Sequence, residues 1–401
     1  MDVPPAPEGD PAVGPRITID YTPAARQQAG IGRYTRELIR ALAQLDTETA
    51  YTLLVRGDAT VPDSLADFSA NFSVRRSPIS ERTLTRLWRL RVPLPADWLA
   101  GPSDVYYSPD YILPPLRRGR AVVTVHDLSF LTVPQAADAG LRAYLTDAVP
   151  RSVARADHVL ADSEHTRQDL ARLLRTPAPK ISVLYSGVSP AFRRVEEGER
   201  LAEVRARYGL AGPFVLGLGT IEPRKNLERL IEAFGRLVAA GEPHALALVG
   251  GQGWLYGPIY ERVQALGLAD RVRFLGFVPD ADLPPLYSAA EAFAFPSLYE
   301  GFGLPPLEAL ACGTPTVVSN VSSLPEVVGD AALQVAPTDV DALAAALARL
   351  LHDEPLRARL RDAGPRQASR FTWPAAAAQL RETLYALHTG EHTAAASLRG
   401  G

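Results

Sequence analysis

Two glutamates and two backbone amides lie close together in one stretch that is rich in glycine and proline. Glu300 and Glu308 have seven residues between them, and Gly303 and Leu304 stand in that interval. The prolines at 305–306 suit the first turn of a helix, where a missing N–H costs nothing. The amides of Gly303 and Leu304 would then open at a helix N-terminus, which is a ready site for an anion.

The two carboxylates suggest what kind of anion this would be. In one interpretation Glu308 only stabilises the helix dipole, an effect of about 0.3–1 kcal/mol. A phosphate at the same helix end would repel such a carboxylate, so an acid kept there is better explained as an acceptor of hydrogen bonds from hydroxyls. A nucleotide sugar offers both groups, a diphosphate for the amides and hydroxyls for Glu300 and Glu308.

The neighbouring residues predict the elements that would position this stretch. The apolar residues 292–295 read as a buried strand, and Thr316–Val318 reads as the start of another. Gly313 and Pro315 would end the helix between them. The predicted unit is therefore a strand, a glycine loop, a short helix and a second strand.

This unit resembles the signature of the retaining glycosyltransferases of family 4. The resemblance rests on Glu300, the Gly-Phe-Gly-Leu-Pro sequence after it, Glu308, and the Glu-Ala-Leu-Ala-Cys-Gly-Thr-Pro sequence that begins there. It implies a GT-B fold, in which two Rossmann-like α/β domains with parallel sheets face each other across a cleft. It also implies transfer of a sugar from a nucleotide donor.

Composition sets limits on the other classes of function. The chain has 401 residues, 47% of them hydrophobic and 22% charged, and a net charge of -3. These values are typical of an ordinary soluble protein, and nothing in them points to nucleic acid. Cys312 is the only cysteine, so an internal disulfide is excluded and a reducing compartment is favoured. The N-terminus has neither the basic start nor the apolar core of a signal peptide.

The first half of the chain carries two candidate site elements. Gly30-Ile31-Gly32-Arg33-Tyr34 resembles the N-terminal glycine loop of family 4, although a plain tight turn would also explain its glycines. We therefore predict that Gly32 lies at the donor site. Ala121–Val125 reads as a strand that ends in His126, and ligands of open α/β sheets collect at such strand ends. The resemblance implies that His126 faces the donor sugar and acts in catalysis with Glu300.

A second glycine loop would hold the donor phosphates. Gly219 follows a predicted strand, and Arg224 and Lys225 bring two positive charges to the start of a helix. Cations oppose the helix dipole there, which makes sense if an anion sits between them. The alternative is a solvated pair of surface cations. The resemblance implies that the backbone of Phe277 and Val278 reads the nucleobase.

We expect no metal ion and no other cofactor. Asp280 and Asp282 form an Asp-x-Asp sequence, the metal-binding motif of the other large glycosyltransferase fold. Asp280 precedes a predicted helix start, however, so an N-cap is the better interpretation. Arg224, Lys225 and the amides would balance the phosphate charge without an ion.

Strand and helix patterns alternate along the whole chain, which predicts two parallel sheets covered on both faces. The charged, helix-prone residues after 193 suggest a linker between them. The resemblance implies that the last helix crosses back to the first domain. The predicted parts are a disordered lead-in over 1–15, an acceptor domain over 16–195, a linker over 196–208, a donor domain over 209–372, and the returning helix over 373–390.

A basic segment over 80–92 alternates leucine and tryptophan with four arginines at roughly helical spacing. Such a helix can lie on an anionic membrane or receive a lipid-linked acceptor. The alternative is a surface helix that packs its apolar face on its own domain. The predicted location is the cytoplasm, at the inner face of the membrane if this segment binds lipid.

Together these features predict a retaining, metal-independent glycosyltransferase that uses a nucleotide-diphosphate sugar. The acceptor would be a glycan or a lipid-linked molecule. Resemblance to mannosyltransferases of polysaccharide assembly, through the Gly30–Tyr34 loop and Glu222-Pro-Arg-Lys-Asn226, makes GDP-mannose the first choice of donor. The alternatives are a nucleotide-sugar epimerase with the same fold and a non-catalytic subunit that binds nucleotide sugar.

Overall fold

The computed structural model describes residues 14–27, 30–57, 59, 68–196 and 198–390. The predicted lead-in over 1–15 lies almost entirely outside these residues, and so does the end of the chain beyond residue 390. Within them the chain forms two sheets, one of seven strands and one of six. Every strand pairing in both sheets is parallel, so the predicted α/β class is confirmed.

The first sheet has the strand order β3-β2-β1-β4-β5-β6-β7. Its inner strands are buried along nearly their whole length because helices cover both faces, and β4 is buried at every position. The strands are β1 (Arg16–Asp20), β2 (Ala50–Arg56), β3 (Phe72–Ser77), β4 (Val105–Ser108), β5 (Arg120–Val125), β6 (His158–Ala161) and β7 (Ile181–Val183).

Among the described residues, seven helices alternate with the strands of this sheet along the chain. Helix α2 buries Tyr34, Leu38 and Leu42, which recur at four-residue intervals on one face. The helices are α1 (Thr22–Arg26), α2 (Ile31–Leu45), α3 (Glu81–Arg89), α4 (Ala96–Ala100), α5 (Ser129–Thr132), α6 (Ala139–Arg155) and α7 (Glu164–Leu173).

The second sheet has the order β10-β9-β8-β11-β12-β13. Its strands are β8 (Phe214–Leu218), β9 (Ala245–Val249), β10 (Val272–Gly276), β11 (Ala292–Phe295), β12 (Thr316–Ser319) and β13 (Leu333–Val335). The remaining helices are α8 (Glu199–Arg207), α9 (Leu227–Ala239), α10 (Gly257–Ala265), α11 (Leu283–Ala289), α12 (Leu304–Ala311), α13 (Leu324–Val328), α14 (Val340–His352), α15 (Glu354–Ala368) and α16 (Trp373–Thr389).

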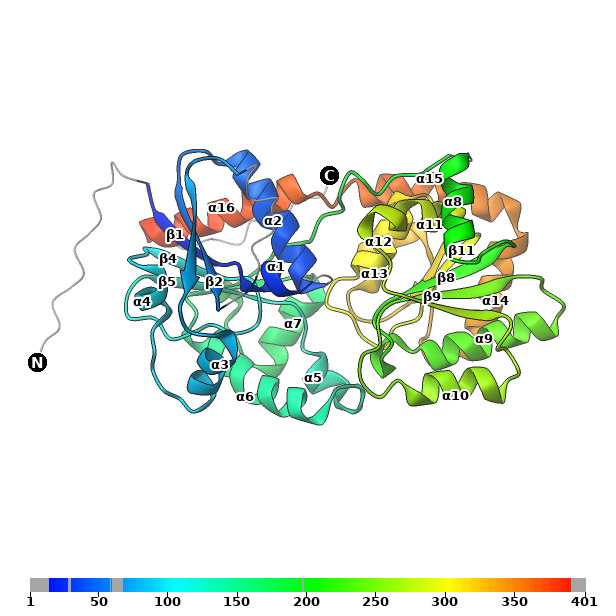
Figure 1. Ribbon diagram of the computed structural model, residues 1–401, viewed down its shortest axis with the longest axis horizontal. Helices are drawn as coiled ribbons and strands as arrows, with labels where there is room; N and C mark the ends of the chain where they lie inside the picture. Colours follow the sequence, from blue (N-terminus) through cyan, green and yellow to red (C-terminus); the bar gives the residue numbers. More distant parts are fainter. Residues whose placement is uncertain (1–13, 28–29, 58, 60–67, 197, 391–401) are drawn as a thin grey trace, which may run out of the picture.

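Figure 1 shows the two α/β halves side by side, with the N-terminal sheet in blue and cyan and the C-terminal sheet in green and yellow. In each sheet the strand order reverses direction once, between β1 and β4 and between β8 and β11. Open α/β sheets bind ligands in the crevice beyond the carboxyl ends of the strands at such a reversal. A ligand site is therefore expected beyond the carboxyl ends of β1 and β4 in one half and of β8 and β11 in the other.

The predicted linker over 196–208 contains helix α8, which packs on the C-terminal half. Leu201 and Val204 of α8 belong to the same buried cluster as Leu286 of α11. The guanidinium of Arg205 also donates a hydrogen bond to the carbonyl of Ala289, at 3.0 Å. This segment is thus built into the C-terminal half, and the crossing between the two sheets occurs in the chain before α8.

The last helix returns to the N-terminal half, as the resemblance implies. In Figure 1, α16 is drawn in red and lies beside α2. Trp373, Leu380 and Leu384 of α16 join the buried cluster that holds Tyr34 and Leu38 of α2. The helix therefore ties the end of the chain to the first sheet.

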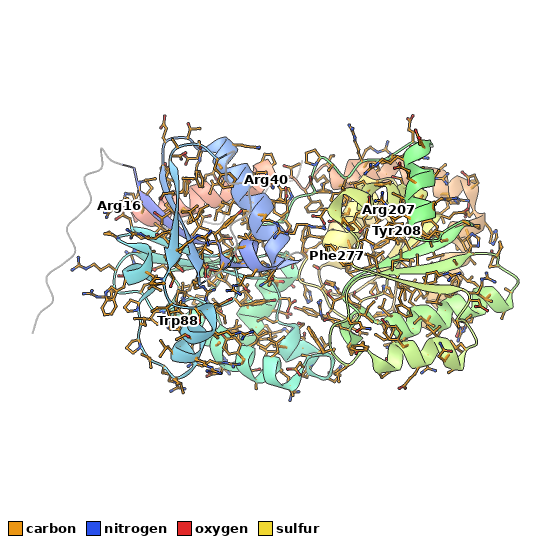
Figure 2. The ribbon with its side chains drawn as sticks, viewed as in Figure 1. Arg16, Arg40, Trp88, Arg207, Tyr208 and Phe277 are labelled. Atoms are coloured by element: carbon orange, nitrogen blue, oxygen red, sulfur yellow. The ribbon has the colours of Figure 1, made fainter. Side chains whose placement is uncertain are left out.

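The basic segment over 80–92 forms helix α3, followed by an exposed turn. Leu84 is fully buried, and the indole of Trp88 lies under the guanidinium of Arg56 and donates to the carbonyl of Leu94. Figure 2 shows Trp88 in the N-terminal half, far from the second sheet. Part of the apolar face thus packs on its own domain, while Leu90 remains 75% exposed.

The packing of α16 gives a test of stability. Leu380 is fully buried, so Leu380→Ala should lower the free energy of unfolding of the N-terminal half by about 2–5 kcal/mol. Urea unfolding followed by circular dichroism would measure this change. Glu382→Ala, at an exposed position of the same helix, serves as the control and should change it by less than about 0.5 kcal/mol. Equal effects of the two substitutions would show that α16 does not contribute to this core.

Candidate active site

A cavity of about 650 Å³ lies between the two halves. Its N-terminal wall contains Tyr111, His126 and Asp127, which follow β4 and β5. Its C-terminal wall contains Gly219, Thr220, Arg224, Lys225, Glu300, Gly301, Phe302, Gly303, Leu304 and Pro305. Seven of the predicted site residues, from both halves, therefore line one cleft: His126, Gly219, Arg224, Lys225, Glu300, Gly303 and Leu304.

The centre of the C-terminal wall is an ion cluster around Glu300. One carboxylate oxygen of Glu300 accepts from the guanidinium of Arg224 at 3.0 Å, and the other accepts from the ammonium of Lys225 at 2.6 Å. Arg224 also donates to Glu222, at 3.1 Å, and to the carbonyl of Tyr299. One acid thus fixes two cations side by side at the edge of the cleft.

Burial and charge act in opposite directions within this cluster. Burial disfavours the ionised form of Glu300, but Arg224 and Lys225 hold its pKa below the usual value. Burial, and then the neighbouring Arg224, lower the pKa of Lys225, while Glu300 opposes that shift. The cluster thus pairs two cations with two carboxylates, since Glu222 also contacts Arg224, at 2.8 Å.

Helix α12 begins at the same wall, as predicted. Gly303 precedes it with φ of 112°, a conformation that favours glycine, and the two prolines occupy its first turn. Among the residues that the structure describes, neither the amide of Gly303 nor that of Leu304 donates to a protein acceptor. Both residues line the cleft, so their N–H groups are open to a bound anion.

His126 lies on the opposite wall, but both of its ring nitrogens are already engaged. Nδ1 lies 2.6 Å from a carboxylate oxygen of Asp162, and Nε2 lies 2.8 Å from the carbonyl oxygen of Pro109. Burial alone would lower the pKa of His126, yet Asp162 raises it to about 9. Two oxygen acceptors require both nitrogens to donate, so His126 is an imidazolium at neutral pH. Its contribution to the cleft is then a fixed positive charge and a ring surface, with no free nitrogen.

Glycine allows the two halves to approach closely beside His126. A Cβ at Gly301 would lie 1.9 Å from the carbonyl oxygen of His126, so no side chain fits there. Nearby, the hydroxyl of Tyr299 donates to Asp169 of α7, at 2.6 Å. At the far side of the cleft, the indole of Trp254 donates to the carbonyl of Ala136, at 2.8 Å.

Glu308 does not line this cavity. It is buried, and it forms an ion pair with Arg33 of α2 and accepts a hydrogen bond from the hydroxyl of Tyr287. Arg33 and Leu304 line both the main cavity and a neighbouring one of about 190 Å³, which Glu308 also lines. Glu308 is thus adjacent to the cleft, and its carboxylate is paired with Arg33 of the other half.

The interpretation of Asp280 as an N-cap is wrong. The carboxylate of Asp280 pairs with Arg33, and it lies in a single turn of 3-10 helix (Asp280–Asp282) that precedes α11. Asp282 instead accepts from Arg207 and Tyr208, two residues labelled on the C-terminal half in Figure 2. Among the described residues, no group of three or more His, Cys, Asp or Glu side chains could hold a metal ion.

Three other predicted site residues lie outside the main cavity. Gly32 is buried in the first turn of α2, where a Cβ would lie 1.9 Å from the carbonyl oxygen of Gln27. Phe277 is 56% exposed and Val278 is buried, and neither lines the cavity. Both stand just before Asp280, whose contact with Arg33 brings their loop toward the N-terminal half.

Sequence reasoning missed three residues that shape the cleft: Arg33, Asp162 and Trp254. Arg33 follows the first glycine loop, where a lone arginine could have been read as a cleft cation. Asp162 follows β6, the neighbour of β5, so the rule that parallel strand ends meet could have placed it beside His126. Trp254 had no such signal, because its loop has no regular structure around it.

Comparison with known proteins now identifies the family. The model described as "Glycosyltransferase Family 4" matches residues 29–192, and the one described as "Glycosyl transferases group 1" matches residues 205–367. The chain is 36% identical over 373 residues to the O-antigen chain mannosyltransferase B of Escherichia coli, which covers 89% of this chain and 96% of that protein. This chain belongs to glycosyltransferase family 4. It is an enzyme that transfers a sugar.

Solved structures confirm the GT-B fold of this glycosyltransferase. Sucrose-phosphate synthase from Thermosynechococcus elongatus matches with a TM-score of 0.72 at 24% identity, over 94% of this chain and all of that one. HepE of Anabaena, solved in complex with UDP and glucose, matches with a TM-score of 0.71 at 20% identity, over 92% of this chain and 99% of that one. At these identities the similarity shows the fold alone.

The His126–Asp162 pair predicts how the stability of the glycosyltransferase depends on pH. Because the folded-state pKa of His126 is raised to about 9, the pair stabilises fully below the unfolded value of about 6.5 and loses this effect as pH rises through 9. Asp162→Asn should therefore cost stability at pH 6 and progressively less up to pH 10. Urea unfolding of both proteins across this range measures the difference, and a difference that stays constant with pH would contradict the assignment.

Proposed function

We propose that this enzyme transfers mannose from GDP-mannose to a glycan or lipid-linked acceptor, with retention of the anomeric configuration and without a metal ion. The observation that carries the proposal is the convergence of Arg224, Lys225 and the α12 amides at one wall of the cleft. The choice of mannose is supported by the relative named as an O-antigen chain mannosyltransferase.

The wall provides positive charge where the leaving group gains negative charge. As the bond between the sugar carbon and the diphosphate oxygen breaks, its electron pair stays with the diphosphate. Arg224, Lys225 and the amides of Gly303 and Leu304 would stabilise that charge, and they are held in place before the reaction begins. The acceptor hydroxyl would form its new bond on the same face of the sugar and pass its proton to the departing phosphate oxygen.

The carboxylates would orient the sugars in this scheme. Each oxygen of Glu300 already accepts one hydrogen bond, but a carboxylate has about four lone-pair sites, so it can still accept from sugar hydroxyls. His126 would face the sugar as a positive charge on the opposite wall. Glu308 would receive ribose hydroxyls once Arg33 releases it.

Metal independence is supported by the fixed cations. The guanidinium of Arg224 and the ammonium of Lys225 lie at the wall of the cleft, and they would neutralise a diphosphate in place of a divalent ion. Buried charge-assisted hydrogen bonds of this kind are worth about 1.5–3 kcal/mol each.

Slow hydrolysis of the nucleotide sugar can be followed even though the acceptor is unknown. It tests which donor the enzyme uses, whether the anomeric configuration is retained and whether a metal ion is required. GDP-mannose and UDP-glucose are incubated separately with enzyme in the presence of a chelator, and the released sugar is followed by NMR. We expect turnover of GDP-mannose with α-mannose as the first product, since water would attack from the same face as an acceptor. Initial release of β-mannose would exclude retention, and activity restored only by Mg²⁺ or Mn²⁺ would exclude metal independence.

Arg224 gives a direct test of the phosphate wall. Arg224→Ala removes one charge-assisted hydrogen bond to the leaving group, so kcat/KM for the donor should fall by roughly 10–150-fold. Steady-state kinetics with the donor measure the change. Arg236→Ala, on the exposed face of α9 and outside the cavity, is the control and should leave kcat/KM unchanged. Equal kinetics of the Arg224→Ala variant and the native enzyme would remove Arg224 from the donor site.

A lipid-linked acceptor is supported by the surface around α3. A cavity of about 380 Å³ contains Trp88, Tyr144 and four arginines, and it adjoins the cleft because Ile112 and Tyr144 line both cavities. The four arginines are Arg89, Arg91, Arg151 and Arg155. Leu90 is exposed beside them. None of the helices in the described part of the chain has the length and apolar character to cross a membrane.

Binding to vesicles tests this contact. Arg82 and Arg86 are exposed on α3, and each basic residue near an anionic surface contributes about 1 kcal/mol. The double variant Arg82→Gln/Arg86→Gln should thus bind phosphatidylglycerol-containing vesicles about 30-fold more weakly in a sedimentation assay. The control Arg359→Gln/Arg366→Gln, at exposed positions of α15, should bind as the native enzyme does. If the native enzyme does not sediment with these vesicles, membrane contact through 80–92 is wrong.

A further inference from the structure

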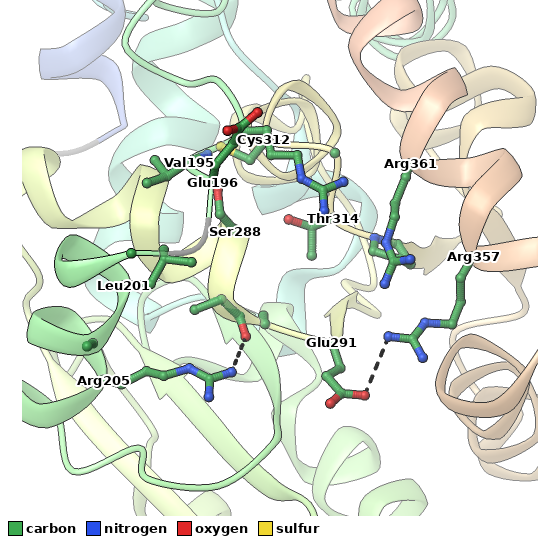
Figure 3. Close-up of a pocket in the computed structure, with 17 residues that line it drawn as sticks. Val195, Glu196, Leu201, Arg205, Ser288, Glu291, Cys312, Thr314, Arg357 and Arg361 are labelled. Atoms are coloured by element: carbon green, nitrogen blue, oxygen red, sulfur yellow. Dashed lines mark hydrogen bonds and ion pairs between the residues drawn. The ribbon is translucent and has the colours of Figure 1, made fainter. Parts of the chain in front are cut away.

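A second large cavity lies outside the cleft. It has a volume of about 780 Å³ and shares no lining residue with the cleft cavity. Figure 3 shows that it lies between α8, the loop before β11, the end of α12 and helix α15. Small-molecule sites are typically cavities of about 300–1,000 Å³. Its size therefore suits a small organic ligand.

The walls of this cavity carry an excess of positive charge. Four arginines and two glutamates line it, so the formal charge of its walls is +2. The arginines come from three segments: Arg194 precedes α8, Arg205 belongs to α8, and Arg357 and Arg361 are one turn apart on α15. In Figure 3, Arg205 lies on one side of the cavity, and Arg357 and Arg361 point toward it from the other.

The protein's own acids satisfy these cations only in part. Arg361 pairs with Glu354, at 2.9 Å. Arg357 pairs with Glu291, at 3.5 Å, and with Glu354, yet its Nε atom is buried and has no hydrogen-bond acceptor. Among the described residues, Arg194 and Arg205 have no carboxylate within 4.0 Å, although Arg205 donates to a carbonyl. A buried donor without an acceptor costs about 1–3 kcal/mol, which an anion in the cavity would recover.

Two simpler explanations do not account for this arrangement. Cations stabilise the C-terminus of a helix such as α12, but one arginine achieves this, and the Cδ atom of Arg194 lies 3.9 Å from where a Cβ on Gly313 would stand. The chain also uses arginine for nearly all of its basic residues, which makes exposed arginines common. The side chain of Arg357, however, is only 16% exposed and so differs from a solvated surface arginine.

We propose that this cavity binds a phosphate monoester of a small organic molecule. A phosphate monoester carries about two negative charges at neutral pH, which matches the charge of the walls. A guanidinium can donate two parallel hydrogen bonds to two oxygens of one phosphate. Arg357 and Arg361 both point toward the cavity, so they could bind the same phosphate. Val195, Leu201 and Pro315 offer apolar contacts to the organic part. The proposal is independent of the donor assignment, because no residue is shared with the cleft.

Isothermal titration calorimetry with glucose 6-phosphate, inorganic phosphate and glucose tests this site. We expect glucose 6-phosphate to bind and glucose not to bind. Arg357→Gln/Arg361→Gln should weaken binding of the phosphate ester at least about 10-fold, and so should Arg205→Gln, which removes no ion pair within the described residues. If inorganic phosphate binds as tightly as the ester, the phosphate group alone is recognised and the organic part makes no contact.

Two matched variants separate this site from other sources of binding. Arg359→Gln, at an exposed position of α15 outside the cavity, should bind glucose 6-phosphate as the native enzyme does. Arg224→Ala, in the cleft, should also leave this binding unchanged, even if it abolishes use of the donor. Lack of binding to the native enzyme at millimolar concentration would overturn the proposal. Binding that persists in both the Arg357→Gln/Arg361→Gln and Arg205→Gln variants would overturn it as well.

Discussion

One carboxylate that holds two cations is the interaction on which the cleft depends. Arg224 and Lys225 are adjacent in the chain, and Glu300 binds both with its two oxygens. Two like charges about 4 Å apart repel by roughly 4 kcal/mol at an effective dielectric constant of 20. Glu300 offsets this repulsion, and Glu222, which pairs with Arg224 at 2.8 Å, supplies a second carboxylate to the cluster. The geometry is possible because β8 and β11 are paired neighbours, so the loops that follow them meet.

The close contacts between the two halves limit the access of water to the cleft. Gly301 lets its backbone touch that of His126, and Trp254 reaches Ala136 on the far side. These contacts flank the cavity and restrict water around a reactive donor, whose hydrolysis would waste the sugar. They also explain why the glycine-rich stretch contains more glycine than the helix start requires. Gly303 adopts the positive φ that the N-terminus of α12 requires, whereas Gly301 lets the backbones of the two halves approach each other.

The fold could be predicted from the sequence because its signals are local. The strand over Ala292–Phe295 is buried on both faces and therefore reads as an apolar run, and the ends of α12 are marked by prolines and by Gly313. The partners of the site residues could not be predicted, because they come from the other half or from another strand. Arg33 and Glu308 are 275 residues apart, and His126 and Asp162 are 36 apart. Periodicity and motifs contain no information about such pairs until the strand order is known.

The Arg33–Glu308 pair limits how a nucleotide can use Glu308. Both side chains are largely buried, with 16% and 3% of their surfaces exposed, and breaking a buried pair by removing one partner costs about 3–5 kcal/mol. If ribose hydroxyls replace Arg33 at Glu308, the buried guanidinium of Arg33 must pair with another anion. A ribose hydroxyl is neutral and cannot be that partner. Asp280 already contacts Arg33 and is half exposed, and the diphosphate of the proposed donor would be a second anion in the cleft. Donor binding at Glu308 would therefore be an exchange of partners by Arg33, which couples the position of α2 in one half to occupancy of the other.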